Sequence, residues 1–139
     1  MRAFIQKLTH ALALLCLSLS FSLSLSASDR EIFDEITSAI KNQIPKVKLD
    51  TVQDKYKGAH IAGRGYVISV SKDVSGDTVV NLSVEKDRSV PVSVSVAVFM
   101  RPNQEKHVNK ISKEKYVYFS GTFENVKMNT IVIRNGIVR

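Results

Sequence analysis

The chain has 139 residues, of which 44% are hydrophobic and 24% are charged, and its formal net charge is +7. This length allows one domain at most, since domains usually span roughly 100–150 residues. Six glycines, three prolines and one cysteine exclude collagen-like and disulfide-rich scaffolds. The high content of β-branched residues excludes a disordered chain.

The first 27 residues have the layout of a secretory signal peptide. Arg2 and Lys7 form a positive start, residues 11–25 carry no charge, and small residues follow at 26–28. The alternative is a retained membrane anchor. Spanning requires about 20 predominantly apolar residues, whereas this run is shorter and contains four serines. We therefore expect cleavage near residue 27, a periplasmic or secreted product of the bacterial cell envelope, and no stable membrane span afterwards.

The only cysteine, Cys16, lies inside the apolar run. A lipid-anchoring cysteine would follow a small residue at the end of such a run, but Leu15 is large and Cys16 is central. We therefore do not expect lipid anchoring there. Cleavage after residue 27 leaves 112 residues with a net charge of +5 and no cysteine. The core must then hold the protein together without disulfides.

Residues 28–44 predict an amphipathic helix. Ser28 and Glu31 fit the S-x-x-E capping box, and Pro45 ends the helix. One apolar face recurs at helical spacing: Ile32, Phe33, Ile36, Ile40 and Ile44. Residues 45–57 are polar and alternate only weakly, so they predict a connector with at most one turn.

From residue 60 onward, apolar residues such as valine and isoleucine recur at every second position, which is the period of a strand that buries one face. Five strands are predicted, over residues 61–71, 78–85, 90–99, 115–123 and 128–138. A short helix is expected within residues 102–113, where Val108 and Ile111 stand three apart among charges.

Three strands, a short helix and two more strands are the order of an OB-fold barrel. The predicted fold is thus all-β with minor α content, a five-stranded OB-fold barrel preceded by an N-terminal amphipathic helix. The expected division is a signal peptide over 1–27, helix and connector over 28–57, and an OB-fold domain over 58–139.

Three segments resemble the tRNA-anti-like OB-fold family. KYKG at 55–58 and GYV at 65–67 resemble its opening strand, VYFSGTF at 117–123 its fourth, and IVIRNGI at 131–137 its last. Members are often small exported bacterial proteins or lipoproteins with a helix ahead of the barrel. The resemblance covers residues 50–139 and implies the fold. It implies nucleic-acid binding only by analogy with other OB-folds.

One candidate ligand-binding set lies on the first and fourth strands: Arg64, Tyr66, Tyr116 and Tyr118. If Val117 and Phe119 face the core, the tyrosines beside them face outward. Exposed tyrosines offer apolar area and lose little entropy on binding. The alternative is that the N-terminal helix covers them.

A second candidate is a basic patch that would attract phosphate: Arg101, Lys106, Lys110, Lys113 and Lys115. The alternative is a merely solvated surface. OB-folds that bind single strands stack bases on aromatic residues of the second and third strands. That face is expected to hold one aromatic ring and no lysine or arginine: Val79, Asn81, Ser83, Glu85, Ser93, Ser95, Ala97 and Phe99.

No metal, cofactor or catalytic motif is expected. After cleavage the histidines are His60 and His107, too few for a zinc site. Residues 73–77 resemble half a calcium loop, but a hairpin turn explains them better. The sequence therefore predicts an exported, non-catalytic module that binds an envelope protein, peptide or glycan. The alternative is a single-stranded nucleic-acid binder that uses basic loops.

Overall fold

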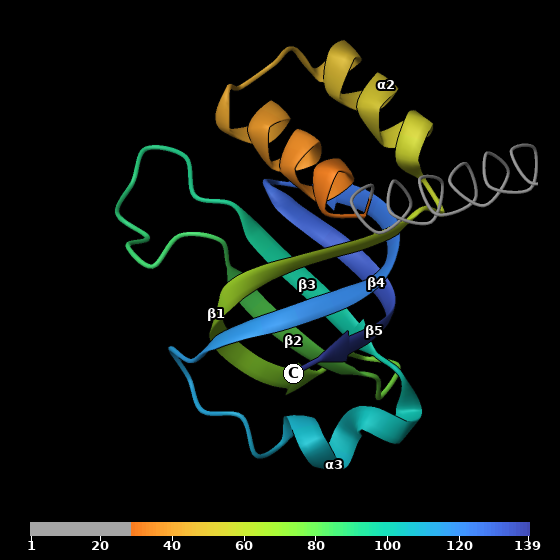
Figure 1. Cartoon of the computed structure of the whole chain (residues 1–139), viewed down its shortest axis with the longest axis vertical. Coiled ribbons are helices and arrows are strands. Elements are labelled where there is room, and N and C mark those ends of the chain that lie inside the picture. The colour runs from red at the N-terminus through yellow and green to blue at the C-terminus, as the bar shows by residue number, and fades with distance from the viewer. Residues whose placement is uncertain (1–28) are drawn as a thin grey trace, which may run out of the picture.

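The computed structural model describes residues 29–139. The expected signal peptide, Cys16 and the Ser28 end of the capping box lie outside these residues. Two helices lead into a β-barrel (Figure 1). Among the described residues, no helix is long and apolar enough to cross a membrane.

The five strands close into a barrel in the order β1-β2-β3-β5-β4. They are β1 (His60–Lys72), β2 (Thr78–Ser83), β3 (Ser95–Met100), β4 (Tyr116–Lys127) and β5 (Thr130–Val138). Neighbouring strands are antiparallel except β3 and β5, which are parallel. The short helices η1 (Pro102–Gln104) and α3 (Glu105–Val108) lie between β3 and β4. This arrangement confirms the predicted OB-fold.

The barrel interior is filled by the side chains that the alternation assigned to it. Fully buried positions come from all five strands, and include Val67, Leu82, Val96, Phe119, Phe123, Ile131 and Ile133. The largest share of the core thus comes from one face of each strand, as expected for a small barrel.

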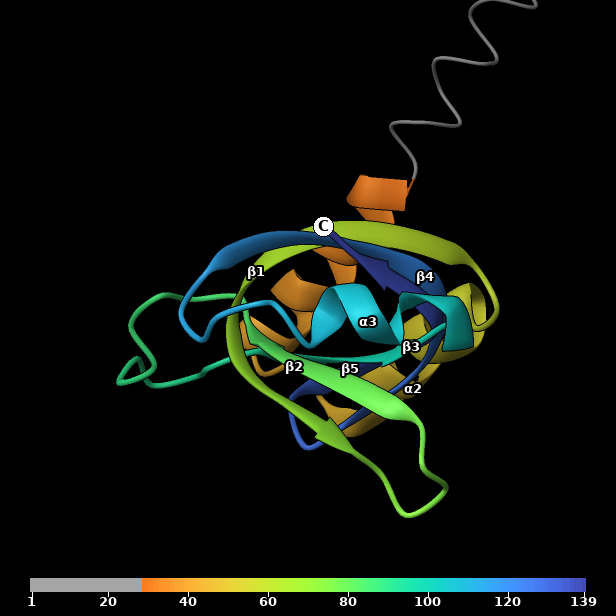
Figure 2. The ribbon, with the colours of Figure 1, turned by 90° about the horizontal axis from the view of Figure 1, so that it is seen from below.

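The first described helix, residues 29–41, closes one end of this barrel (Figure 1). The ring of Phe33 meets that of Phe119 edge-on, with centroids 5.2 Å apart and an interplanar angle of 80°. Gly63 provides the space: a Cβ there would lie 2.7 Å from the Phe33 ring and 2.8 Å from Phe119. α3 covers the opposite end with the buried Val108, as the view from below shows (Figure 2).

Residues 46–56 correct the sequence prediction, because they form the helix α2 (Lys46–Tyr56) where a connector was expected. Its packed side chains, Leu49, Val52 and Tyr56, have helical spacing but are only partly buried. The backbone N–H of Val126 donates to Gln53 Oε1 at 2.7 Å, which ties α2 to β4. The preceding helix ends at residue 41, earlier than predicted, because Gln43 adopts φ 49°.

The third strand is also shorter than predicted, since it begins at Ser95 and residues 84–94 form a loop. Pro91 has no N–H to donate to a ladder. Val94 still reaches the core, and its N–H donates to Glu85 Oε2 at 3.1 Å. Val92, which is partly buried, packs against the core from the loop, so the row of packed valines continues beyond the strand.

β4 and β5 meet in a two-residue turn that the alternation did not reveal. Met128 and Asn129 have φ of 47° and 63°, which suits the type I′ turn of a tight hairpin. β4 therefore extends to Lys127 instead of residue 123, and β5 begins at Thr130 instead of Met128. A register shift between Phe123 and Asn125 interrupts the alternation in this part of β4.

Replacing Gly63 with alanine tests the contact between the helix and the barrel. We expect Gly63→Ala to destabilise the protein by about 1–3 kcal/mol, because the added methyl overlaps Phe33 and Phe119. The loss should shrink when Phe33→Ala is also present, since the ring is then gone. Urea unfolding of the single and double variants measures this coupling. If the losses in free energy of unfolding of the two single variants add up to the loss of the double variant, the proposed contact is contradicted.

Glu105 predicts a pH-dependent contribution to stability. The Thr78 hydroxyl donates to Glu105 Oε1 at 2.9 Å and Lys72 Nζ lies 3.5 Å away, so the pKa of Glu105 is held below its ordinary value. A lowered folded-state pKa contributes stability above the unfolded pKa, and this is lost as pH falls through the folded value. We expect Glu105→Gln to be less stable at pH 7 and the difference to fade below about pH 4. Denaturant unfolding curves across this pH range measure the difference in free energy of unfolding between the two proteins. A difference that does not change with pH would contradict the prediction.

Candidate ligand-binding surface

The four residues of the first candidate set lie together on the outer face of β1 and β4. Arg64 is the direct cross-strand partner of Tyr118, and Tyr66 is that of Tyr116. The alternate positions on these strands face the core, so these four side chains point outward. We name this set the aromatic ledge: Arg64, Tyr66, Tyr116 and Tyr118.

The side chains of the aromatic ledge contact one another in pairs. The rings of Tyr66 and Tyr116 have centroids 4.7 Å apart and are tilted by 41°. The guanidinium of Arg64 lies over the ring of Tyr118, 5.0 Å from its centroid, in a cation–π arrangement. Tyr116 remains 51% exposed and Tyr118 43% exposed, so the first helix lies beside these rings and leaves them open to solvent.

A cavity of about 180 Å³, here named the notch, lies between the aromatic ledge and the first helix. Its lining comprises Arg30, Phe33, Asp34, Gly63, Arg64, Val84, Tyr116 and Tyr118. Among residues 29–139, no carboxylate forms an ion pair with Arg30 or Arg64. Sequence reasoning missed the notch because the three lining residues of the first helix, Arg30, Phe33 and Asp34, reach it only after the helix has docked.

Tyr118 also pairs with Arg139, the residue that follows β5. Its N–H donates to the Arg139 carbonyl at 2.9 Å, and the Arg139 N–H donates back at 2.8 Å. A cavity of about 120 Å³ lies here, lined by Tyr118, Phe119, Ser120, Ile137 and Arg139. Tyr118 therefore lines two hollows, the notch and this smaller cavity.

The basic patch lies on α3 and on the segment that leads into β4, at the end of the barrel away from the first helix (Figure 2). All four of its lysines are exposed, and none has an ion-pair partner within the described residues: Lys106, Lys110, Lys113 and Lys115. Arg101 differs, because its Nε donates to the Asn135 carbonyl at 3.0 Å. Lys115 immediately precedes Tyr116, so the patch adjoins the aromatic ledge.

The outer face of β2 and β3 carries an arginine that the sequence analysis did not place there. Arg134 comes from β5, and its guanidinium lies 3.8 Å from the ring centroid of Phe99. Its Nε also donates to Glu124 Oε2 at 2.9 Å. The parallel pairing of β3 with β5 creates this contact between distant parts of the sequence. The single aromatic ring of this face is therefore covered, and the arginine over it is already paired.

Two residues expected on that face lie elsewhere. Glu85 and Ser93 belong to the loop between β2 and β3, because both strands are shorter than predicted. Glu85 lies 2.6 Å from Lys41 Nζ, which connects the loop to the first helix.

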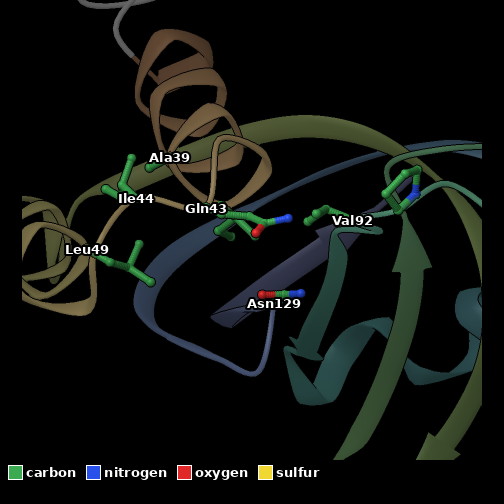
Figure 3. A pocket seen from close by; sticks show the side chains of 8 residues that line it. Ala39, Gln43, Ile44, Leu49, Val92 and Asn129 are labelled. Atoms are coloured by element: carbon green, nitrogen blue, oxygen red, sulfur yellow. The ribbon is translucent and has the colours of Figure 1, made fainter.

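A larger cavity of about 370 Å³ lies at the far end of the first helix (Figure 3). Its walls come from four separate segments: Ala39, Ile40, Gln43, Ile44, Leu49, Pro91, Val92 and Asn129. None of these eight residues is charged, so the cavity offers apolar contacts and two side-chain amides. Sequence reasoning missed it because its walls meet only after both helices have packed.

His60 and residues 73–77, which the sequence analysis weighed for metal binding, make local contacts. Within residues 29–139, no three His, Cys, Asp or Glu side chains gather as a metal site. His60 Nδ1 lies 2.8 Å from Asp29 Oδ2, which links β1 to the first helix. Asp73 Oδ1 accepts from the N–H groups of Ser75 and Asp77, each at 2.9 Å, as expected in a hairpin turn.

No protein-family model and no curated protein matches the sequence. Solved structures similar to it include a Klebsiella pneumoniae protein considered a nucleic acid-binding lipoprotein, with 14% identity over 64% of this chain and 76% of that chain (TM-score 0.47). An OBody bound to hen egg-white lysozyme shares 23% identity over 61% of this chain and 83% of the OBody (TM-score 0.42). A mitochondrial single-stranded DNA-binding protein from S. cerevisiae shares 12% over 59% and 94% (TM-score 0.37). At these identities, the likeness concerns the fold alone.

Proposed function

We propose that the protein is an exported, non-catalytic binding module that holds an envelope protein, peptide or glycan on the aromatic ledge. The observation that carries this proposal is the pair of half-exposed tyrosines on β4, each in contact with an outward side chain of β1. Tyrosine presents a large amphipathic surface with few rotatable bonds, so little entropy is lost on binding.

The backbone beneath the aromatic ledge favours a preformed site. Both strands belong to the closed barrel, and their inward neighbours Val117 and Phe119 are buried. The ring of Tyr66 and the guanidinium of Arg64 further restrict the two exposed tyrosines. A surface that already has its binding conformation loses less conformational entropy when the ligand binds.

The chemistry of the aromatic ledge suits binding better than catalysis. Its groups are three phenols and a guanidinium. None of them is a carboxylate, an imidazole or a thiol, the side chains that most often act as general bases or nucleophiles. They supply stacking area, hydrogen bonds and one positive charge.

Membership of the tRNA-anti-like OB-fold family is part of the proposal. The three segments that resemble this family, within residues 55–70, 117–123 and 131–137, fall on the end of α2 and on β1, β4 and β5. These are the elements that carry or border the aromatic ledge.

The alternative function, binding of single-stranded nucleic acid, is favoured by the exposed lysines beside Tyr116, which have no ion-pair partner within residues 29–139. The outer face of β2 and β3 argues against it, because Arg134 covers Phe99 and is itself paired with Glu124. Phosphate-driven binding would weaken steeply as salt increases. Titration of a labelled single-stranded oligonucleotide at several salt concentrations, with and without lysine-to-glutamine changes in the basic patch, tests this alternative.

The double variant Tyr116→Ala with Tyr118→Ala tests the proposed function. We expect it to lose no more than about 2 kcal/mol of stability, since a cross-strand pair contributes about 0.2–1 kcal/mol. We expect it to lose the envelope proteins or glycans that the unmodified protein captures from its native host. Denaturant unfolding and a pull-down with mass spectrometry measure both effects.

The matched control is Val47→Ala with Met128→Ala, which truncates two exposed apolar residues outside the aromatic ledge, 78% and 99% exposed. This control should capture the same partners as the unmodified protein. If the tyrosine double variant captures the same partners as the unmodified protein, the aromatic ledge is not the binding site.

Export is tested by the intact mass of the protein isolated from the envelope fraction. We expect a chain that begins near Ser28, because small residues at 26–28 follow the charge-free run. A mass that still includes Met1 would contradict cleavage.

A further inference from the structure

We propose that the notch and the aromatic ledge together recognise an acidic peptide segment, with a carboxylate in the notch and an aromatic ring or proline on the ledge. This inference rests on the proposed function and adds the chemical class of the ligand. It follows from the charges that line the notch, from their distribution between two elements, and from the spacing of the cross-strand pairs.

The notch is equipped to bind a carboxylate. Arg30 of the first helix and Arg64 of β1 both line it, and no described carboxylate forms an ion pair with either. A guanidinium matches a carboxylate with two parallel hydrogen bonds. The stacking of Arg64 on Tyr118 holds one of these groups in place. The volume of about 180 Å³ is that of roughly six water molecules, which is ample for a carboxylate.

The surroundings of the notch strengthen an ion pair formed there. Phe33 and Val84 contribute apolar walls, and the rings of Tyr116 and Tyr118 form another side. Charges that meet beside apolar walls are screened less than charges in open water. The exposed lysines of the adjoining basic patch add a positive field that attracts an acidic partner and speeds its encounter.

Asp34 favours a peptide over a nucleic acid. Its carboxylate lines the same notch as the two arginines, so the site combines positive donors with one acceptor. A peptide carries backbone N–H groups next to its acidic side chains and can satisfy both. Asp34 repels a carboxylate and a phosphate alike, but a phosphodiester backbone has no N–H donor that would offset this repulsion.

The spacing of the aromatic ledge predicts a short recognition pattern. The pair Arg64–Tyr118 and the pair Tyr66–Tyr116 are two residues apart along both strands, or roughly 7 Å. In an extended peptide, side chains on one face repeat at the same interval. We therefore expect an acidic residue two positions away from an aromatic residue or a proline.

Selection from a displayed library of random 12-residue peptides against the purified protein tests this inference. We expect the retained peptides to be enriched in Asp or Glu two positions from Tyr, Phe, Trp or Pro. A synthetic peptide from this pool should bind at least about tenfold more weakly to Arg64→Gln and to Arg30→Gln, because each change removes a charged donor. Replacing the acidic residue of the peptide by its amide should have a similar effect.

Lys127→Gln is the matched control, because it removes one exposed positive charge from the far end of β4. It should leave the affinity unchanged, and thermal unfolding of all variants checks that they fold. The inference would be overturned by a selection that retains no peptide, by a pool without acidic enrichment, or by arginine variants that bind the peptide as tightly as the unmodified protein does. So would a polythymidine oligonucleotide or a neutral glycan that binds the same site more tightly than the peptide.

The tyrosine double variant separates this inference from the proposed function. If the arginine variants bind normally while Tyr116→Ala with Tyr118→Ala abolishes binding, the proposed binding function is supported and the preference for an acidic peptide is wrong. If neither pair of changes affects binding, both are wrong.

Discussion

The structure depends on the entry of one aromatic ring into the end of the barrel. A five-stranded barrel leaves its ends open, and the ring of Phe119 would face water there without a cover. Phe33 provides that cover, and it fits only because β1 has no side chain at Gly63. The docking of this ring fixes the first helix, and the helix in turn places one wall of the notch and one wall of the larger cavity.

The same two strands carry core side chains on one face and the proposed binding surface on the other. Inward positions of β1 and β4 accept Phe33 and pack Val117 and Phe119, while outward positions carry the aromatic ledge. The inward and outward side chains alternate along the same backbone, so the core fixes the direction of the aromatic ledge without contacting its outer surface. Changes to the ledge are therefore separable from changes to the core.

Alternation was sufficient to predict the five strands, their inward faces and the outward direction of Tyr116 and Tyr118. It failed where other forces decide the conformation. Pro91 delays the start of β3, and the φ values of Met128 and Asn129 create a turn that hydrophobicity does not report. α2 was missed because its packed face, through Leu49, Val52 and Tyr56, is narrow and only partly buried. The notch and the contact between Arg134 and Phe99 join segments distant in sequence, which no local pattern encodes.

Closure of the barrel through the parallel pairing of β3 and β5 also limits how the protein can aggregate. In the described residues every strand has two hydrogen-bonded neighbours, so no strand edge offers a template for another chain. Because residues 29–139 contain no cysteine, the closed barrel is held together without a disulfide. Once β3 and β5 have paired, the folded molecule is protected from strand exchange with neighbouring molecules, however crowded its surroundings are.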